Sequence, residues 1–94
     1  MSASSSKLLD VLSLVKRRLE SSQQSDWTPF TPTEIVVTID RELESLRSTG
    51  HLANPSELVF LFSPTAPIQE ISMANNWSEE FLELSEQFDG LVEK

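Results

Sequence analysis

The sequence predicts an α+β fold in which three helices pack on a small antiparallel β-hairpin, in the order α-α-β-β-α. Three stretches carry apolar residues at the spacing of an amphipathic helix. Between the second and the third lies a short apolar run, residues 58–62, which is followed by two prolines and is typical of a buried strand. A two-stranded sheet needs a covering layer, so we expect the helices to pack on it. The alternative is an all-α fold of four to five short helices.

The first predicted helix begins near Lys7, and the basic residues 16–18 lie in its last turn, where positive charge complements the helix dipole. Ser5 or Ser6 can cap its start. One stripe holds its apolar residues: Leu8, Val11, Leu12, Val15 and Leu19. The small polar residues before it have nothing to bury. We therefore expect a disordered N-terminal tail over residues 1–6 and a single compact domain over residues 7–94.

The second predicted helix has the clearest start signal in the chain. Thr31 can cap it, Pro32 suits its first position, and Glu34 can complete a capping box. Gly50 is placed to end it. Its apolar face is formed by Ile35, Val36, Ile39, Leu43 and Leu46. The spacing of these residues predicts a helix packed on the core by one side.

The stretch after the second helix allows two interpretations. In the favoured one, residues 58–62 and 68–73 are the two strands of the hairpin, because Ile71 and Met73 would share one side of the second strand. In the other, residues 54–57 have the order of an N-cap, a first-turn proline and a capping box, which opens a short helix in place of the first strand.

The last predicted helix is capped by Ser78, and Glu79 and Glu80 lie in its first turn, beside the positive end of the helix dipole. Gly90 is placed near its end. The buried stripe is formed by Phe81, Leu84, Phe88, Leu91 and Val92.

The chain is acidic, with 15 acidic and 7 basic residues and a formal net charge of -8. Such a chain is repelled by nucleic-acid backbones and anionic lipid, so we expect neither nucleic acid nor a membrane as partner. Residues 77–94 carry a net charge of -5, whereas residues 1–20 carry +2. The two terminal helices are therefore complementary in charge and can pair within one molecule or between two, so a homodimer is possible.

The candidate partner-binding residues are Trp77, Glu79, Glu83 and Glu86. The three glutamates fall on one face of the last helix, opposite its aromatic residues. Charge complementarity would steer a basic protein partner to this face, and tryptophan is enriched in interface hot spots. The alternatives are that the acidic face only keeps the protein in solution, and that Trp77, like Trp27, fills the core.

Catalytic chemistry has few candidate residues in this sequence. There is no cysteine, His51 is the single histidine, and two glycines are too few for a phosphate-binding loop. A usual zinc site is not available. We predict no catalytic residue, no cofactor and no metal site, and a protein that is not an enzyme. The enzyme hypothesis would need a cleft that joins His51 to a buried acid.

These observations favour a non-catalytic protein-interaction or regulatory module that uses its acidic last helix, for example a small inhibitor or immunity-type protein that blocks a basic surface. A self-associating structural subunit of a homo-oligomer is the alternative, and an enzyme is the third possibility. The chain has no cysteine, no run of 18 apolar residues and no signal-like N-terminus, so a cytoplasmic location is expected.

Overall fold

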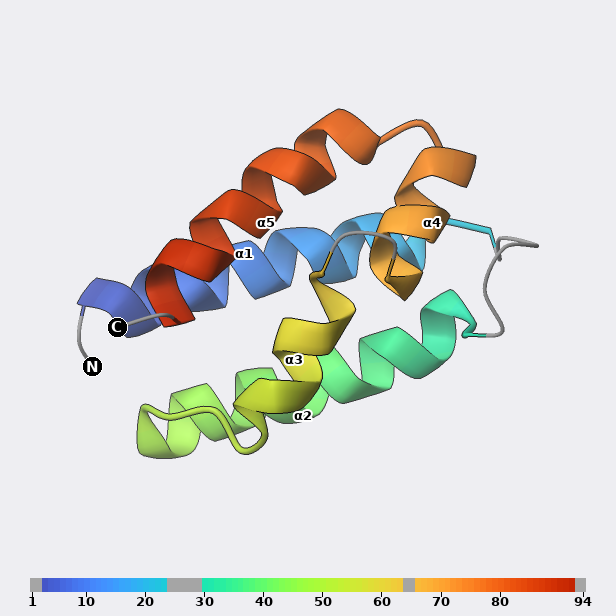
Figure 1. Cartoon of the computed structure of the whole chain (residues 1–94). Helices are drawn as coiled ribbons and strands as arrows, with labels where there is room; N and C mark the ends of the chain where they lie inside the picture. The colour runs from blue at the N-terminus through green and yellow to red at the C-terminus, as the bar shows by residue number, and fades with distance from the viewer. Residues whose placement is uncertain (1–2, 24–29, 64–65, 93–94) are drawn as a thin grey trace.

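The structure is a computed structural model that describes residues 3–23, 30–63 and 66–92. It contains five helices: α1 (Ala3–Glu20), α2 (Pro32–Thr49), α3 (Pro55–Leu61), α4 (Pro67–Ala74) and α5 (Ser78–Val92) (Figure 1). No strand occurs in the described residues, so the predicted hairpin and the α+β class are wrong. The fold is the all-α alternative.

The predicted first strand, residues 58–62, forms most of helix α3 and its C-cap. Asn54 caps this helix, since its side chain accepts a hydrogen bond from the Glu57 backbone N–H at 3.3 Å, and Pro55 occupies the first position. Burial follows the helical period rather than alternating along the stretch. Leu58, Leu61 and Phe62 are buried, whereas Val59 and Phe60 are exposed.

The predicted second strand, residues 68–73, lies within helix α4. Pro67 occupies the first position of this helix, but its N-cap residue Ala66 makes no side-chain cap hydrogen bond. Ile68 and Ile71 are fully buried and Met73 is exposed. The expected sharing of one face by Ile71 and Met73 was therefore wrong, because the two residues point to different sides of a helix.

Helix α2 starts and ends where the sequence predicts. The Thr31 hydroxyl accepts a hydrogen bond from the Glu34 backbone N–H at 3.1 Å, and Pro32 is the first helical residue. Gly50 ends the helix at φ 79°, in the left-handed region that favours glycine. Helix α1, in contrast, begins at Ala3, so Ser5 and Ser6 lie inside it instead of capping it.

Helix α1 packs against α2 and α5, and α4 packs against α5 and α2. Helices α1 and α5 run antiparallel, so the start of α1 and the end of α5 lie at the same end of the molecule (Figure 1). At the other end, Gln23 and Asn75 exchange two hydrogen bonds of 2.9 Å and tie the end of α1 to the α4–α5 connection. The molecule measures 37 × 22 × 20 Å.

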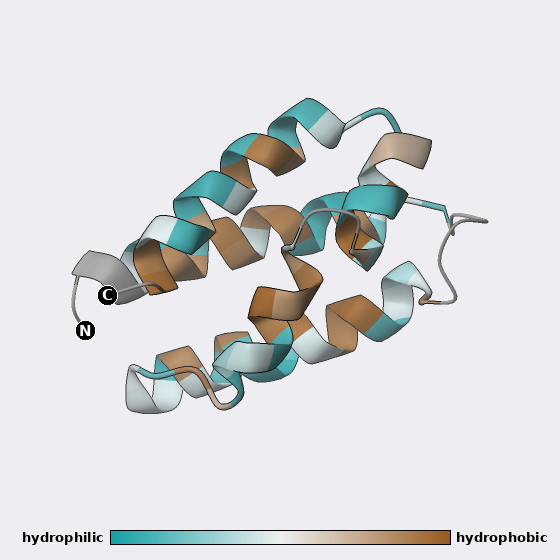
Figure 2. Ribbon diagram, viewed as in Figure 1, coloured by the Kyte–Doolittle hydropathy of each residue, from teal (hydrophilic) through white to brown (hydrophobic). Residues whose placement is uncertain are grey.

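The core lies where the apolar sides of the helices meet (Figure 2). Phe62, at the end of α3, stacks on Phe88 of α5 with ring centroids 4.3 Å apart and lies 5.9 Å from the ring of Phe81. The Ser85 hydroxyl donates a hydrogen bond of 3.0 Å to the Phe62 carbonyl. Helix α5 therefore holds the end of α3 by both ring stacking and a hydrogen bond.

Glu42 on α2 is a fully buried carboxylate. Its Oε1 accepts a hydrogen bond from the Ala53 backbone N–H at 2.8 Å, and its Oε2 accepts one from the Asn54 N–H at 3.1 Å. Arg41 Nε lies 3.7 Å from Oε2. Backbone N–H groups that are removed from water need a hydrogen-bond acceptor. Here the Glu42 carboxylate is the acceptor for two successive residues, Ala53 and Asn54. Glu42 thus fixes the start of α3 relative to α2.

None of the helices in the described part of the chain is both long enough and apolar enough to span a bilayer.

Candidate protein-binding site

The three glutamates predicted as a docking surface lie on the exposed side of α5. Glu79, Glu83 and Glu86 are all exposed, and none of them forms an ion pair within the described residues. Leu82, between them in the sequence, is exposed as well. Isolated exposed leucines are ordinary on protein surfaces. The exposed face of α5 is therefore mainly negatively charged, and Leu82 is its one apolar side chain among these four residues.

The neighbouring Glu80 is used inside the molecule. Arg18 Nε donates to its Oε1 at 2.7 Å and Arg18 Nη2 to its Oε2 at 2.8 Å, a bidentate pair that joins α1 to α5. The hydrogen bond from Arg18 holds the pKa of the Glu80 carboxyl below its ordinary value, and the pKa of Arg18 is raised in return. The charge complementarity of the terminal helices is realised at this pair within one molecule.

Trp77 belongs to the core and not to the acidic face. Its side chain is only 7% exposed, and its ring meets Phe81 edge-on at a centroid distance of 6.2 Å. The indole Nε1 donates a hydrogen bond of 2.9 Å to the Ser22 hydroxyl. Trp77 and Glu79 both line an open cleft of about 450 Å³ at the start of α5, whereas Glu83 and Glu86 do not line it. Trp27 lies outside the described residues.

His51 lies in the connection between α2 and α3 and is exposed. The cleft of about 200 Å³ beside it is formed by apolar residues of α1, α2 and α5 and by Pro55, with no carboxylate among its described lining residues. The parts of the chain that the structure describes hold no group of three or more side chains suited to bind a metal ion.

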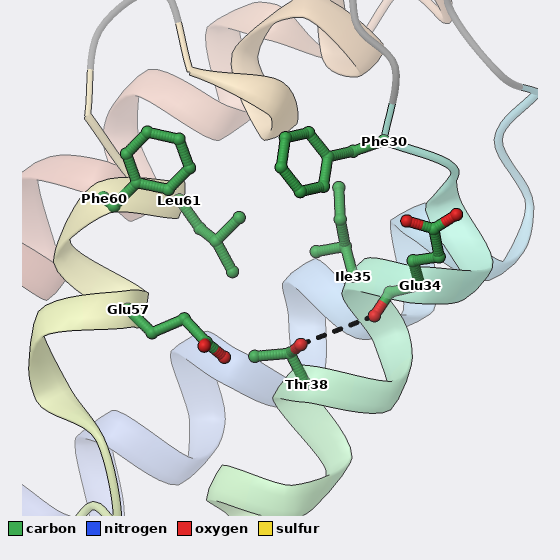
Figure 3. Close-up of a pocket in the computed structure, with 7 residues that line it drawn as sticks. All are labelled: Phe30, Glu34, Ile35, Thr38, Glu57, Phe60 and Leu61. Carbon is green, nitrogen blue, oxygen red and sulfur yellow. Dashed lines mark hydrogen bonds between the residues drawn. The ribbon is translucent and has the colours of Figure 1, made fainter.

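A groove that the sequence did not predict lies between the start of α2 and α3 and has a volume of about 290 Å³ (Figure 3). Ile35 and Leu61, both buried, form its apolar base. Phe30 and Phe60 lie across it with ring centroids 6.4 Å apart and an interplanar angle of 59°. Their exposed fractions are 37% and 52%, so two adjacent aromatic rings meet solvent here. The remaining lining residues are Glu34, Thr38 and Glu57.

Two local structures hold these rings in place. The Thr31 cap starts α2 directly after Phe30, which places that ring at the start of the helix. The Glu42 carboxylate and the Asn54 cap fix the start of α3, and Phe60 then falls on the outward side of that helix. The groove is therefore a consequence of two well-defined helix starts.

The charged residues of the groove are both acidic. Arg41 Nη2 donates to Glu57 Oε1 at 2.6 Å, although Arg41 does not line the groove. Among the described residues, no side chain forms an ion pair or a hydrogen bond with the Glu34 carboxylate. Thr38 Oγ1 donates a long hydrogen bond of 3.5 Å to the Glu34 carbonyl (Figure 3). The site can therefore accept apolar surface and positive charge.

One signal in the sequence could have revealed the groove. The cap sequence of residues 54–57 predicts a helix, and in that helix Val59 and Phe60 fall opposite the buried Leu58 and Leu61. The hairpin interpretation instead placed Phe60 in a buried strand and hid its exposure. An exposed phenylalanine on a short helix is a stronger indication of binding than a row of glutamates, because it is unfavourable in water.

The residues that the structure describes thus form five helices and an acidic groove rimmed by aromatic side chains. No family model matches the chain, and neither a curated protein nor a solved structure shows significant similarity to it.

Proposed function

We propose that this chain is a small non-catalytic protein-interaction module whose protein partner docks in the groove between α2 and α3. The observation that supports this most is the exposure of Phe30 and Phe60 on an apolar base of Ile35 and Leu61. Large aromatic side chains contribute much of the energy at protein interfaces when a partner covers them.

The groove is a better candidate than the acidic face of α5. Both surfaces carry negative charge, but the face formed by Glu79, Glu83 and Glu86 lacks the anchor that Trp77 would have supplied, since this side chain is buried. Exposed charges alone steer association and contribute little to affinity. We therefore assign the partner to the groove and keep the α5 face as the competing surface.

The test is capture of bound proteins from the native host by tagged variants of the chain. Phe60→Ser removes the larger part of the exposed aromatic surface. Met73→Ser on α4 is the matched control, because Met73 and Phe60 are 55% and 52% exposed. We expect Phe60→Ser to lose the bound partner, with at least about a tenfold decrease in recovery, and Met73→Ser to retain it.

A third variant reverses the charge of Glu79, Glu83 and Glu86 to lysine. If the partner is still recovered with Phe60→Ser but is not recovered with this triple variant, the groove is contradicted and docking takes place on α5. Met73 lines the cleft at the start of α5 together with Glu79, so loss of recovery with Met73→Ser would also contradict the groove and place docking on the α5 side.

The proposal includes a cytoplasmic location, which is supported by the absence of cysteine from the chain.

Self-association of the chain is the alternative to binding a different protein. Sedimentation at high micromolar concentration separates a monomer from a homo-oligomer.

A further inference from the structure

The chemistry of the groove indicates which kind of partner segment it accepts, an inference that rests on the proposed function. We propose that the groove binds a short segment of another protein in which one or two large apolar side chains are flanked by lysine or arginine.

The size of the groove limits what it can hold. Pockets for small-molecule ligands usually measure about 300–1,000 Å³. The groove, at about 290 Å³, lies just below this range. In Figure 3 the rings of Phe30 and Phe60 lie on opposite sides of the groove, above Ile35 and Leu61. Because the two ring centroids are only 6.4 Å apart, the space suits one or two apolar side chains packed against the rings and over Ile35 and Leu61, rather than between the rings.

The negative charges of the groove favour positively charged residues next to the apolar side chain of the partner. Glu34 lies on the α2 side, and the Glu57 carboxylate reaches from α3 toward Thr38 (Figure 3). No lysine or arginine is among the described residues that line the groove. Arg41 neutralises part of the charge of Glu57, whereas the Glu34 carboxylate is open to a cation from a partner. The net charge of -8 on the whole chain adds long-range attraction for a basic segment.

The same charges argue against two other occupants. A second copy that docked groove to groove would bring Glu34 and Glu57 of both chains together, and like charges in an interface are unfavourable. A phosphorylated or acidic segment would meet the same repulsion.

The test uses defined peptides and fluorescence anisotropy. The probe is fluorescein-labelled Lys-Lys-Leu-Phe-Lys-Lys, and its two controls replace either Leu-Phe by Ser-Ser or all four lysines by glutamate. We expect the probe to bind, and both controls to bind at least about tenfold more weakly, because apolar burial and charge both contribute.

Two double variants separate the groove from the general acidity of the protein. E34Q/E57Q and E79Q/E83Q each remove two negative charges, one pair from the groove and one from the α5 face. We expect E34Q/E57Q to raise the Kd of the probe about five- to tenfold and E79Q/E83Q to change it less than about twofold, since charge pairs act mainly at short range in salt. E34Q alone is the fallback variant if the loss of Glu57 disturbs α3.

Three results would overturn the inference: equal effects of the two double variants, equal binding of the glutamate peptide, or no binding of the probe at all. The proposed function can stand in each case. If Phe60→Ser still abolishes capture of the native partner while the basic probe shows no preference for the groove, the groove is the docking site and only the chemistry assigned to its partner is wrong.

Discussion

Glu42 is the residue on which the position of α3 depends. Its carboxylate accepts hydrogen bonds from the backbone N–H groups of Ala53 and Asn54, and it does so while fully buried. A buried charge is tolerated only when its oxygens are engaged. The arrangement is therefore specific to a carboxylate with both oxygens turned toward the connection between α2 and α3.

Glu42→Gln tests this role. The substitution keeps the shape of the side chain but removes its charge and replaces one oxygen by an N–H₂ group, so the Asn54 N–H keeps at most one of its two acceptors. Hydrogen bonds to a charged acceptor contribute about 1.5–3 kcal/mol and neutral ones about 0.5–1.5 kcal/mol, so the free energy of unfolding should fall by about 1–3 kcal/mol. Urea unfolding followed by circular dichroism measures it. Glu44→Gln on the exposed side of α2 is the control, and equal losses for the two variants would contradict the assigned role.

Residue-scale features were predictable from the sequence where they depend on near neighbours. The Thr31 cap, Pro32 and Gly50 act within one turn of α2, and all three were predicted. Glu42 could not be recognised, because its partners Ala53 and Asn54 are eleven and twelve residues away and approach it only when α3 is in place.

At the scale of elements, the long helices were predictable and the short ones were not. Helix α2 starts at the residue expected for it, and α5 starts at Ser78, which was predicted as its cap and is its first helical residue. Both helices could be placed because their apolar stripes extend over several turns. Helices α3 and α4 have seven and eight residues, so each shows only about two turns of the pattern. At that length, the apolar run of residues 58–62 fits a strand as well as a helix.

The pair between Arg18 and Glu80 gives a prediction for the contact of α1 with α5. The folded state lowers the pKa of Glu80, so the carboxylate stabilises the fold at neutral pH. Both groups are partly exposed, with side-chain exposed fractions of 50% and 38%. Solvent screens such a pair, and Glu80→Gln should therefore lower Tm by a few degrees at most.

The sign of the pH dependence follows from the lowered pKa. The stabilisation by Glu80 is complete above the ordinary glutamate pKa of about 4.3 and is lost as the pH falls through the lower pKa of the folded state. The difference in Tm between the wild type and Glu80→Gln should therefore be present at pH 7 and disappear in strong acid. Glu83→Gln, at an exposed position without an ion pair in the described residues, is the control for the loss of one surface carboxylate at pH 7.

At the scale of the whole molecule, stability depends on the contact between the end of α3 and α5. Phe62 and Phe88 are fully buried and stack at 4.3 Å, and Phe81 extends this cluster. A domain of 94 residues has a stability near the lower end of about 5–15 kcal/mol. One aromatic ring can therefore account for much of the total.

Phe88→Ala should cost about 3–5 kcal/mol and leave a large fraction of the molecules unfolded at 37 °C. Urea unfolding and the loss of near-ultraviolet circular dichroism measure this effect. Leu82→Ala, on the exposed side of the same helix, should change the free energy of unfolding by no more than about 0.5 kcal/mol. A small effect of Phe88→Ala would show that the cluster is not the centre of the core.

The groove is also a property of the whole molecule, which explains why the sequence did not predict it. Its lining comes from residues 30–38 and 57–61, two segments that meet only after α3 folds back against α2. The acidic face of α5, by contrast, is formed by neighbours in one helix and was visible from spacing alone. Sequence patterns reveal faces of single helices more readily than surfaces shared between helices.

The contacts that join the end of α1 to the start of α5 have a consequence for the order of folding. Gln23 with Asn75, Ser22 with Trp77 and Arg18 with Glu80 pair residues that are 52, 55 and 62 positions apart. Closing so long a loop costs entropy that nearby contacts do not, so we expect these pairs to form after the local contacts within the helices. During synthesis, α1 leaves the ribosome before α5, and its α5-facing side stays uncovered until α5 emerges.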